Sequence, residues 1–175
     1  MNRITVTEKG QSLTFTFEDI LKYFGSGKIS GCVVGVSHGL ISMQLAFPML
    51  DAGRPLERRE VSVRTAFPGA GARDALEMVT RCFTDGRVVV DKNMPEAKDA
   101  VESPGGRYCF EYSYRGRTVA CSVKPGWVKP EFIALARVKN RTPEQEAALD
   151  AMKRETAQRL LAAQPGDVYE ARLVA

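Results

Sequence analysis

The chain has 175 residues, a length that predicts a single domain over residues 1–175 with a sizeable core that needs no disulfide or metal. Hydrophobic residues make up 44% of it and charged residues 26%, as in an ordinary soluble globular protein. The net charge of +4 is mild and spread along the chain, and its tightest basic cluster has no interleaved aromatic residues. Nucleic acid is therefore not an expected partner.

Cysteine and histidine are too sparse for a self-contained zinc ribbon, because four cysteines lack any CxxC spacing and there is one histidine. The first residues have no apolar leader, so we expect a cytoplasmic protein with reduced thiols. Residues 29–50 carry no charge and have the length of a membrane span. Their serines, histidine, glutamine and proline favour a helix buried in a core, so no membrane partner is expected.

In the first third of the chain, Ile4 and Val6 predict a short edge strand. Thr16 then has the character of an N-cap for a short helix that ends near Phe24. After a cluster of glycines, a mostly apolar helix is expected from about residue 31 to 47 or 50, and a turn follows it at 51–55.

In the middle third, residues 60–67 alternate between apolar and polar side chains, which predicts a half-buried strand. The sequence PGAG at 68–71 ends that strand and opens a helix over residues 72–83. A short strand at 88–91 and a polar loop at 93–106 complete this part.

In the last third, residues 108–114 and 118–123 predict a hairpin with its turn at Arg115-Gly116. Residues 132–138 form an apolar element of undetermined type. Thr142 to Gln145 is a capping box that starts a helix running to about residue 163, and a short tail follows it. Helices and strands that are interspersed in this way predict an α+β fold with a mixed sheet.

The stretch GSGKISGC at residues 25–32 superficially resembles a phosphate-binding loop. A P-loop requires Ser or Thr after its Gly-Lys pair, a glycine five residues before that pair, and a preceding strand; here Ile29, Lys22 and a helix stand in those places. Glycine also recurs every fourth residue at 27, 31, 35 and 39, which on a helix makes a bare stripe. The stripe favours a tight contact between this helix and a sheet within the domain, and a dimer or ligand contact is the alternative.

Each side chain that could bind a ligand or take part in a reaction also has a purely structural interpretation. Tyr108, Phe110, Tyr112 and Tyr114 share one face of a strand, where packing under a helix is favoured over stacking of a planar ligand. His38 is expected to be a hydrogen-bonded core or interface residue, with an acid–base role as the alternative. Arg73 and Asp74 open a helix after a glycine-rich turn, which suits an anion at the helix N-terminus but is equally an ordinary turn.

The order of motifs resembles the FmdE family of formylmethanofuran dehydrogenase. The resemblance covers about residues 17–171 and rests on GKISG at 27–31, DALEMVTRCFTDGR at 74–87, GRYCFEYSYRGRTVACSVKPG at 106–126 and the capped helix after Thr142. It implies an FmdE-like core of helix, strand, helix and three strands, followed by a C-terminal helix. The C-terminal zinc ribbon that many family members carry is absent from this sequence.

The resemblance also implies a metal site whose ligands have changed. Where the family has a histidine and a cysteine in the first motif, this chain has Lys28 and Ser30, which are poor ligands for zinc. Cys82 is the clearest survivor of the family's ligand set. A zinc or other transition-metal site rebuilt from Cys32, His38 and Cys82 is an open alternative, although Cys32 and His38 lie six residues apart and point to different sides of a straight helix.

Three hypotheses of function follow from these features. The first is an FmdE-like accessory or ligand-binding protein, homodimeric in the family's manner and linked by resemblance to a molybdenum or tungsten enzyme of one-carbon metabolism. The second is an enzyme or binding protein for a small anion held in a cationic pocket by Lys28, Ser30, Arg73 and Asp74. The third is a transition-metal or haem-type binding protein. No cofactor is identified by the sequence, and whether the protein is an enzyme is left open.

Overall fold

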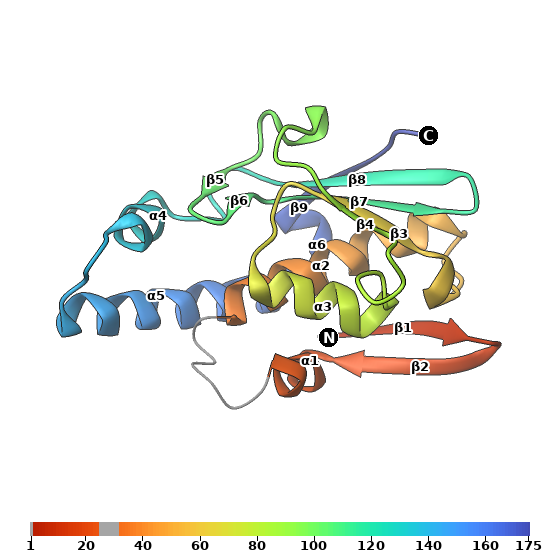
Figure 1. Ribbon diagram of the computed structural model, residues 1–175, viewed down its shortest axis with the longest axis horizontal. Coiled ribbons are helices and arrows are strands. Elements are labelled where there is room, and N and C mark those ends of the chain that lie inside the picture. Colours follow the sequence, from red (N-terminus) through yellow and green to blue (C-terminus); the bar gives the residue numbers. More distant parts are fainter. Residues whose placement is uncertain (1, 25–31) are drawn as a thin grey trace.

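The computed structural model describes residues 2–24 and 32–175, and it is an α+β fold built on one mixed five-stranded sheet. The strand order is β4-β3-β7-β8-β9, in which β3 and β4 run parallel and the other neighbours run antiparallel. Figure 1 shows the sheet above a layer of helices, so one of its faces is covered by helices and the other by a loop. The strands of this sheet are β3 (Ser62–Thr65), β4 (Val88–Val90), β7 (Cys109–Tyr114), β8 (Arg117–Val123) and β9 (Tyr169–Leu173).

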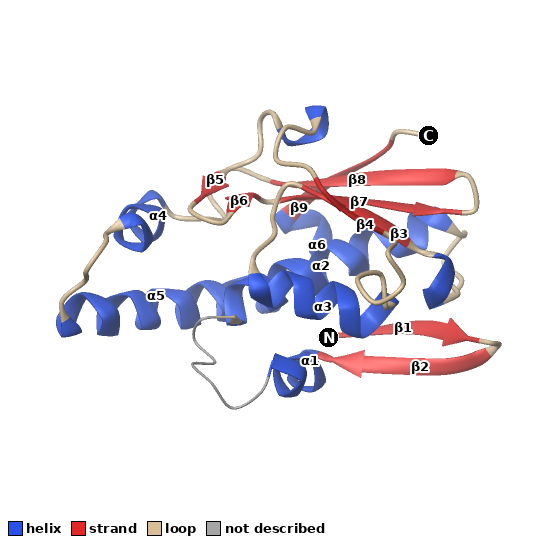
Figure 2. Cartoon of the chain, in the orientation of Figure 1, coloured by secondary structure: helices blue, strands red, loops and turns tan. Residues whose placement is uncertain are grey.

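The helices lie mainly on one side of that sheet, as the blue elements of Figure 2 show. The long central helix α2 contacts β7, β8 and β9 as well as α3 and α5. The expected mixed α+β class is therefore confirmed. The helices are α1 (Phe17–Phe24), α2 (Val33–Leu50), α3 (Ala70–Thr80), α4 (Pro130–Arg137), α5 (Pro143–Ala162) and α6 (Pro165–Val168).

The β7–β8 hairpin forms where the sequence predicts it. Arg115 and Gly116 have positive φ angles of 46° and 80°, the conformation of a two-residue turn that matches the twist of the strands it joins. The four aromatic residues from Tyr108 to Tyr114 are all buried, and the Tyr112 ring meets Phe47 of α2 edge to face at 5.4 Å. The prediction that this aromatic face packs under a helix is confirmed.

Helix α2 is apolar on every side because it is surrounded by the rest of the protein. Among the described residues it is the one helix long and apolar enough to cross a membrane, and 72% of it is buried inside the fold. The polar side chains that it carries find partners there: the Ser37 hydroxyl donates to the carbonyl of Val33, and Ser42 lies 2.6 Å from the Tyr112 hydroxyl. The expectation of a buried core helix is thus met.

The glycine stripe on α2 is filled by α3. A Cβ at Gly35 would lie 2.8 Å from the amide nitrogen of Ala72, and one at Gly71 would overlap the carbonyl oxygen of Cys32 and lie 2.9 Å from the nitrogen of Val36. The contact is between two helices, where the sequence suggested a helix and a sheet. Gly35 and Gly39 are thereby accounted for within one chain and give no support to a dimer; Gly27 and Gly31 lie outside the described residues.

The N-terminal segment differs from the expectation of one short edge strand. It forms a separate antiparallel hairpin of β1 (Arg3–Glu8) and β2 (Gln11–Thr16), with positive φ angles at Lys9 and Gly10. Thr16 caps α1 as predicted, because its hydroxyl accepts from the amide of Asp19. A Lys-Gly turn is a weaker hairpin signal than Asn-Gly or Asp-Gly, which is why the second strand was missed.

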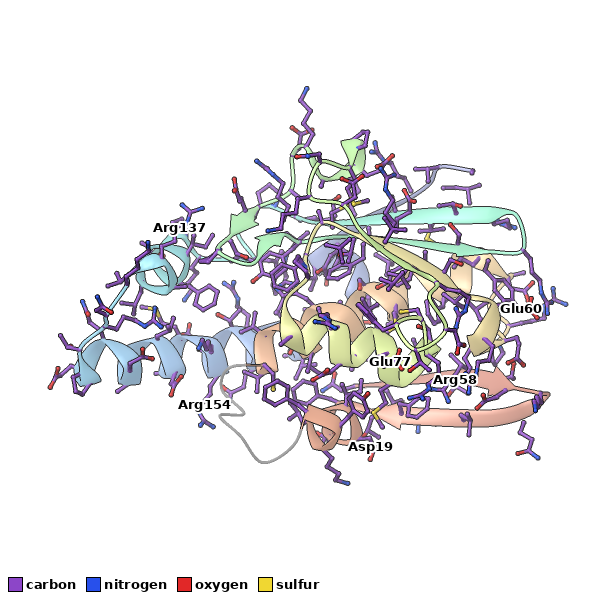
Figure 3. All side chains as sticks on the ribbon, in the orientation of Figure 1. Asp19, Arg58, Glu60, Glu77, Arg137 and Arg154 are labelled. Atoms are coloured by element: carbon purple, nitrogen blue, oxygen red, sulfur yellow. The ribbon has the colours of Figure 1, made fainter. Side chains whose placement is uncertain are left out.

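Arg58 ties this hairpin to the rest of the protein. Its guanidinium donates to the carbonyls of Met78 and Val79 at the end of α3 and pairs with Glu8 of β1 at 3.3 Å. Glu77, in the last turn of α3, accepts hydrogen bonds from the amides of Phe83 and Thr84 and fixes the turn that follows this helix. Figure 3 shows Arg58 and Glu77 together between α3 and the hairpin. Arg58 therefore has a structural role.

In the C-terminal third, the sequence leaves the type of one element open and does not predict one strand. The apolar segment 132–138 belongs to helix α4, and α5 begins with the predicted capping box, in which the amides of Thr142 and Gln145 each bond to the other residue's side chain. The expected tail is in fact α6 followed by β9, which completes the sheet beside β8. The polar loop 93–106 also ends in two very short paired strands, β5 (Glu102–Ser103) and β6 (Gly106–Arg107).

Replacing Gly71 by Ala is expected to lower the free energy of unfolding by about 1–3 kcal/mol, because the added methyl overlaps the backbone of α2. Gly166 in α6 has no atom within 4 Å of the position of its missing Cβ, so Gly166→Ala is the matched control and should change stability by less than about 1 kcal/mol. Urea unfolding followed by circular dichroism measures both variants. Equal midpoints for the two would contradict the close contact of α2 with α3.

Candidate ligand-binding site

Of the four residues predicted to hold an anion, the structure describes Arg73 and Asp74, whereas Lys28 and Ser30 lie outside the described residues. The Arg73 guanidinium lies over the ring of Phe83 at 4.9 Å and is exposed to solvent. Asp74 is half-buried in α3, and this burial raises the pKa of its carboxyl group. In the structure, Arg73 therefore packs against the ring of Phe83.

The thiols of Cys32 and Cys82, considered as metal ligands, are both buried. Burial, and then the nearby charge of Asp74, raises the pKa of Cys32 to about 11. Cys82 is fully buried just after α3, and burial raises the pKa of this thiol as well. Both environments thus favour the thiol over the thiolate, which is the form of cysteine that binds zinc.

No group of three His, Cys, Asp or Glu side chains that could hold a metal occurs within residues 2–24 and 32–175. Cys32, His38 and Cys82 are therefore not brought together as a ligand set. The His38 ring faces tyrosines, with its Nδ1 atom bonded to Tyr169. The described residues do not fit the zinc or other transition-metal site that the sequence left open, because helix α2 directs Cys32 and His38 to different surroundings.

His38 is a hydrogen-bonded core residue, as its default interpretation predicted. It is 0% exposed, and its Nδ1 atom lies 2.6 Å from the hydroxyl of Tyr169. Burial alone lowers the pKa of His38 to about 3, so the imidazole is neutral at physiological pH. The other ring nitrogen, Nε2, is buried and has no hydrogen-bond partner among the described residues.

Three aromatic rings are stacked above α2. The His38 ring lies 4.0 Å from that of Tyr108, which in turn lies 4.2 Å from that of Phe67. The sequence brings them together because Phe67 follows β3 and Tyr108 precedes β7, and these two strands are antiparallel neighbours. One end of the sheet thus ends in a continuous aromatic stack.

A cavity of about 210 Å³ opens beside this stack, and we call it the aromatic cavity. Its wall combines the start of α2, the start of α3, the β5–β6 turn and the facing sides of α4 and α5. The residues that line it are Val34, Gly35, Phe67, Gly69, Ala70, Gly71, Ser103, Pro104, Gly105, Tyr108, Phe132, Ala136, Arg141, Leu149 and Lys153. Arg73 is not one of them.

Arg141 and Lys153, the two cationic side chains that line the aromatic cavity, differ in whether they can contact a ligand. Arg141 donates to Glu146 at 2.8 Å and to the carbonyls of Ala136 and Val138, so its guanidinium joins α4 to α5. Lys153 on α5 forms, among the described residues, an ion pair only with Asp150, at 3.8 Å, and its side chain is 21% exposed. Of the described cations in the wall, Lys153 is the one that can meet a ligand.

A larger cavity of about 510 Å³ lies at the other end of α2, between β1 and the end of α5. Two of its polar side chains are engaged within the fold: Gln44 donates to the carbonyl of Arg3, and Arg54 pairs with Asp51 at 2.5 Å. The aromatic cavity is the stronger candidate because it combines the rings of Phe67 and Tyr108 with the available cation Lys153.

His38 and Tyr108 were singled out from the sequence, whereas Lys153 and Tyr169 were missed. Lys153 follows Met152 on a helix of alternating charge and carries no local signal of binding. Tyr169 lies 131 residues after His38 and in a strand that was not predicted. The one signal that could have pointed to Tyr169 was its place in a short C-terminal segment in which apolar and polar residues alternate.

The fold and the cavity define a small α+β protein with one mixed five-stranded sheet and a ligand-sized cavity at one end of that sheet. No known protein-family model matches the chain, and no curated protein matches it.

The buried His38 should make stability depend on pH above the range in which carboxyl groups titrate. Its pKa is about 3 in the folded protein and about 6.5 in an unfolded chain, so between these values only the unfolded state binds the proton. The free energy of unfolding should therefore fall by about 2 kcal/mol between pH 7.5 and pH 5 on account of this group. No charged group contributes to the shift, and the groups that face the imidazole are the aromatic ring of Tyr108 and the hydroxyl of Tyr169.

The measurement is the urea midpoint at pH 5, 6 and 7.5 for the wild type and for the double variant His38→Phe, Tyr169→Phe, which leaves no unpaired hydroxyl. The double variant should lose most of the pH slope in this window. An unchanged slope would show that another group is responsible.

Proposed function

We propose that the chain is an FmdE-like, single-domain accessory protein that binds a small planar organic anion in the aromatic cavity. The observation that carries the proposal is the meeting of an aromatic wall, Phe67 and Tyr108, with the available cation Lys153 in one cavity. A planar apolar body can pack against the rings while its negative charge lies near the ammonium group.

The size of the cavity limits the ligand. A volume of about 210 Å³ is below the usual range of about 300–1,000 Å³ for sites that take drug-sized molecules. The ligand should accordingly be a compact molecule with one ring or an equivalent planar group. A dinucleotide or an intact haem is too large for this cavity.

Binding is favoured over catalysis by the chemistry of the wall. Its described lining residues include no carboxylate, thiol or imidazole. The nearby His38 is neutral with a pKa of about 3, and the pKa of Cys32 is raised to about 11, so neither is poised for acid–base or nucleophilic work near pH 7. A lysine and aromatic rings are sufficient to hold an anion but supply no general base.

The resemblance to the FmdE family supports the remaining parts of the proposal. They are a homodimer in the cytoplasm and a partner among the molybdenum or tungsten enzymes of one-carbon metabolism. In this proposal the metal-binding corner has been lost, and the anion takes over as the bound ligand. The described thiols and imidazole, which make no metal group, are consistent with that loss.

Replacing Lys153 by Gln should weaken binding of benzoate and 4-acetylbenzoate by about tenfold or more, because a charge-assisted hydrogen bond is lost. Lys22 is the matched control, since it also pairs with an aspartate three residues earlier, Asp19 at 3.5 Å, but lies on α1 away from the aromatic cavity. Isothermal titration calorimetry measures both variants. Binding that is lost equally in Lys22→Gln, or no binding of either acid to the wild type, would contradict the proposal.

Metal analysis tests the part of the proposal that says that the metal-binding corner has been lost. The protein purified without added metal should contain far less than one transition-metal ion per chain, and a chelator should leave its melting temperature unchanged. Stoichiometric zinc, iron or nickel, together with a lower melting temperature after chelation, would restore the metal-binding hypothesis.

A further inference from the structure

Strand β9 is an edge of the five-stranded sheet, and within residues 2–24 and 32–175 no strand pairs with its outer side. It pairs with β8 in one unbroken antiparallel register and contains no proline, glycine or bulge. Natural edge strands are commonly shielded by such features or by being very short, because their unpaired backbone groups otherwise accept another strand. The outer side of β9 is therefore open to pairing.

The hydrogen bonds at the two ends of β9 show which of its residues face β8. The carbonyl of Val168 accepts from the amide of Lys124, and the amide of Val174 donates to the carbonyl of Thr118. Since the direction of the backbone groups alternates along an antiparallel strand, the even-numbered residues bond to β8. The odd-numbered residues of β9 turn their amides and carbonyls to the outer side.

Three residues thus supply the outward backbone groups. Ala171 and Leu173 each present an amide and a carbonyl. Tyr169 presents only its carbonyl, because its amide donates to the carbonyl of Pro165 in α6. The free edge therefore begins where α6 ends and offers both donors and acceptors.

The side chains of β9 are arranged symmetrically about Ala171. Glu170 and Arg172 flank it on the sheet face opposite α2, where both are exposed, and neither makes a side-chain hydrogen bond or ion pair among the described residues. On the other face, Tyr169 is buried and Leu173 is 53% exposed. An acid and a base thus lie at equal distances on either side of a small residue.

We propose that β9 pairs antiparallel with β9 of a second copy of the chain, about a two-fold axis at Ala171, so that two five-stranded sheets become one continuous sheet. In this register the amide of Ala171 donates to the carbonyl of the second copy's Ala171, and the amide of Leu173 donates to the carbonyl of the second copy's Tyr169. The two-fold axis repeats both bonds in the opposite direction. Each outward amide thereby gains an acceptor.

Charge complementarity favours a second copy over an unrelated strand. In the register centred on Ala171, Glu170 lies directly opposite the second copy's Arg172, at a position where cross-strand side chains are closest. Leu173 lies opposite the second copy's Tyr169, so its exposed side chain gains an apolar neighbour. A two-fold interface needs a surface that complements itself, and this strand has that property.

Strand β4, at the opposite edge of the sheet, does not offer the same match. It has three residues, and the symmetrical register that uses all of them is centred on Val89 and places Arg87 opposite the second copy's Asp91. Both of these side chains are already engaged, because Arg87 donates to the carbonyl of Thr80 and Asp91 accepts from Arg64 at 2.7 Å. Pairing through β4 would therefore add no new ion pair.

The proposed interface is small. Strand β9 contributes five residues from each copy, whereas stable complexes use roughly 20–30 residues a side. The dimer should therefore dissociate on dilution, with a dissociation constant in the micromolar range. This interface rests on the proposed function only for the existence of a homodimer and does not involve the ligand of the aromatic cavity.

Sedimentation velocity of the whole chain, from low micromolar to submillimolar concentration, measures the association. Ala171→Pro removes an outward amide and spares the bonds to β8, so it should weaken the dimer by about tenfold or more. Val90→Pro in β4 is the matched control, since the neighbouring amide of Asp91 donates to Thr65 and that of Val90 therefore also points outward. It should leave the association unchanged, and circular dichroism shows whether both variants are folded.

Charge reversal tests the register. Glu170→Arg and Arg172→Glu each place like charges opposite one another in a dimer of that variant, so each should weaken self-association by about tenfold. In an equimolar mixture of the two variants, the two positive side chains of one chain meet the two negative side chains of the other. The mixture should therefore associate at least as tightly as the wild type.

The outcomes separate this interface from the proposed function. A dimer that Ala171→Pro and both charge reversals leave unchanged overturns the interface and keeps the homodimer of the proposed function. A mixture that associates no better than either variant alone overturns the two-fold register. Monomers at every concentration overturn both the interface and the homodimer, whereas binding of benzoate, tested with Lys153→Gln, is decided independently.

Discussion

The close approach of α2 and α3 is the constraint on which the rest of the structure depends. With no Cβ at Gly35 or Gly71, the backbone of α3 lies directly against that of α2. This contact places the start of α3 beside the start of α2, with Phe67 at the end of β3 immediately before it. The aromatic stack, the cavity next to it and the burial of His38 all follow from that geometry, because a wider separation would open the stack to solvent.

The same contact explains why a glycine-rich sequence looks like a ligand-binding motif without being one in the described residues. Gly71 opens α3 after a strand, as a phosphate-binding turn would, but the carbonyl of Cys32 occupies the space that a side chain there would need. Arg73 points to Phe83. The cation that can meet a ligand in the aromatic cavity comes instead from α5 and is Lys153.

Local signals were sufficient to predict the elements whose beginning, end or turn is marked in the sequence itself. The Arg115-Gly116 turn, the Thr142 capping box and the alternation before Phe67 all predicted elements that the structure contains. Strands β2 and β9 were missed, because each is defined by pairing with a partner strand and not by a strong turn. The site was only partly predictable for a related reason: His38 meets Tyr169 across 131 residues, and Lys153 lies on a helix that is otherwise ordinary.

Binding of a small planar acid between Lys153 and the rings of Phe67 and Tyr108 in the aromatic cavity can be observed by intermolecular nuclear Overhauser effects between 4-acetylbenzoate and the isotopically labelled protein. We expect contacts from the ring protons to Phe67 and Tyr108, and from the ring protons next to the carboxylate to the side chain of Lys153. Contacts to the larger cavity beside β1, or none to Phe67 and Tyr108, would show that the acid does not bind in this way.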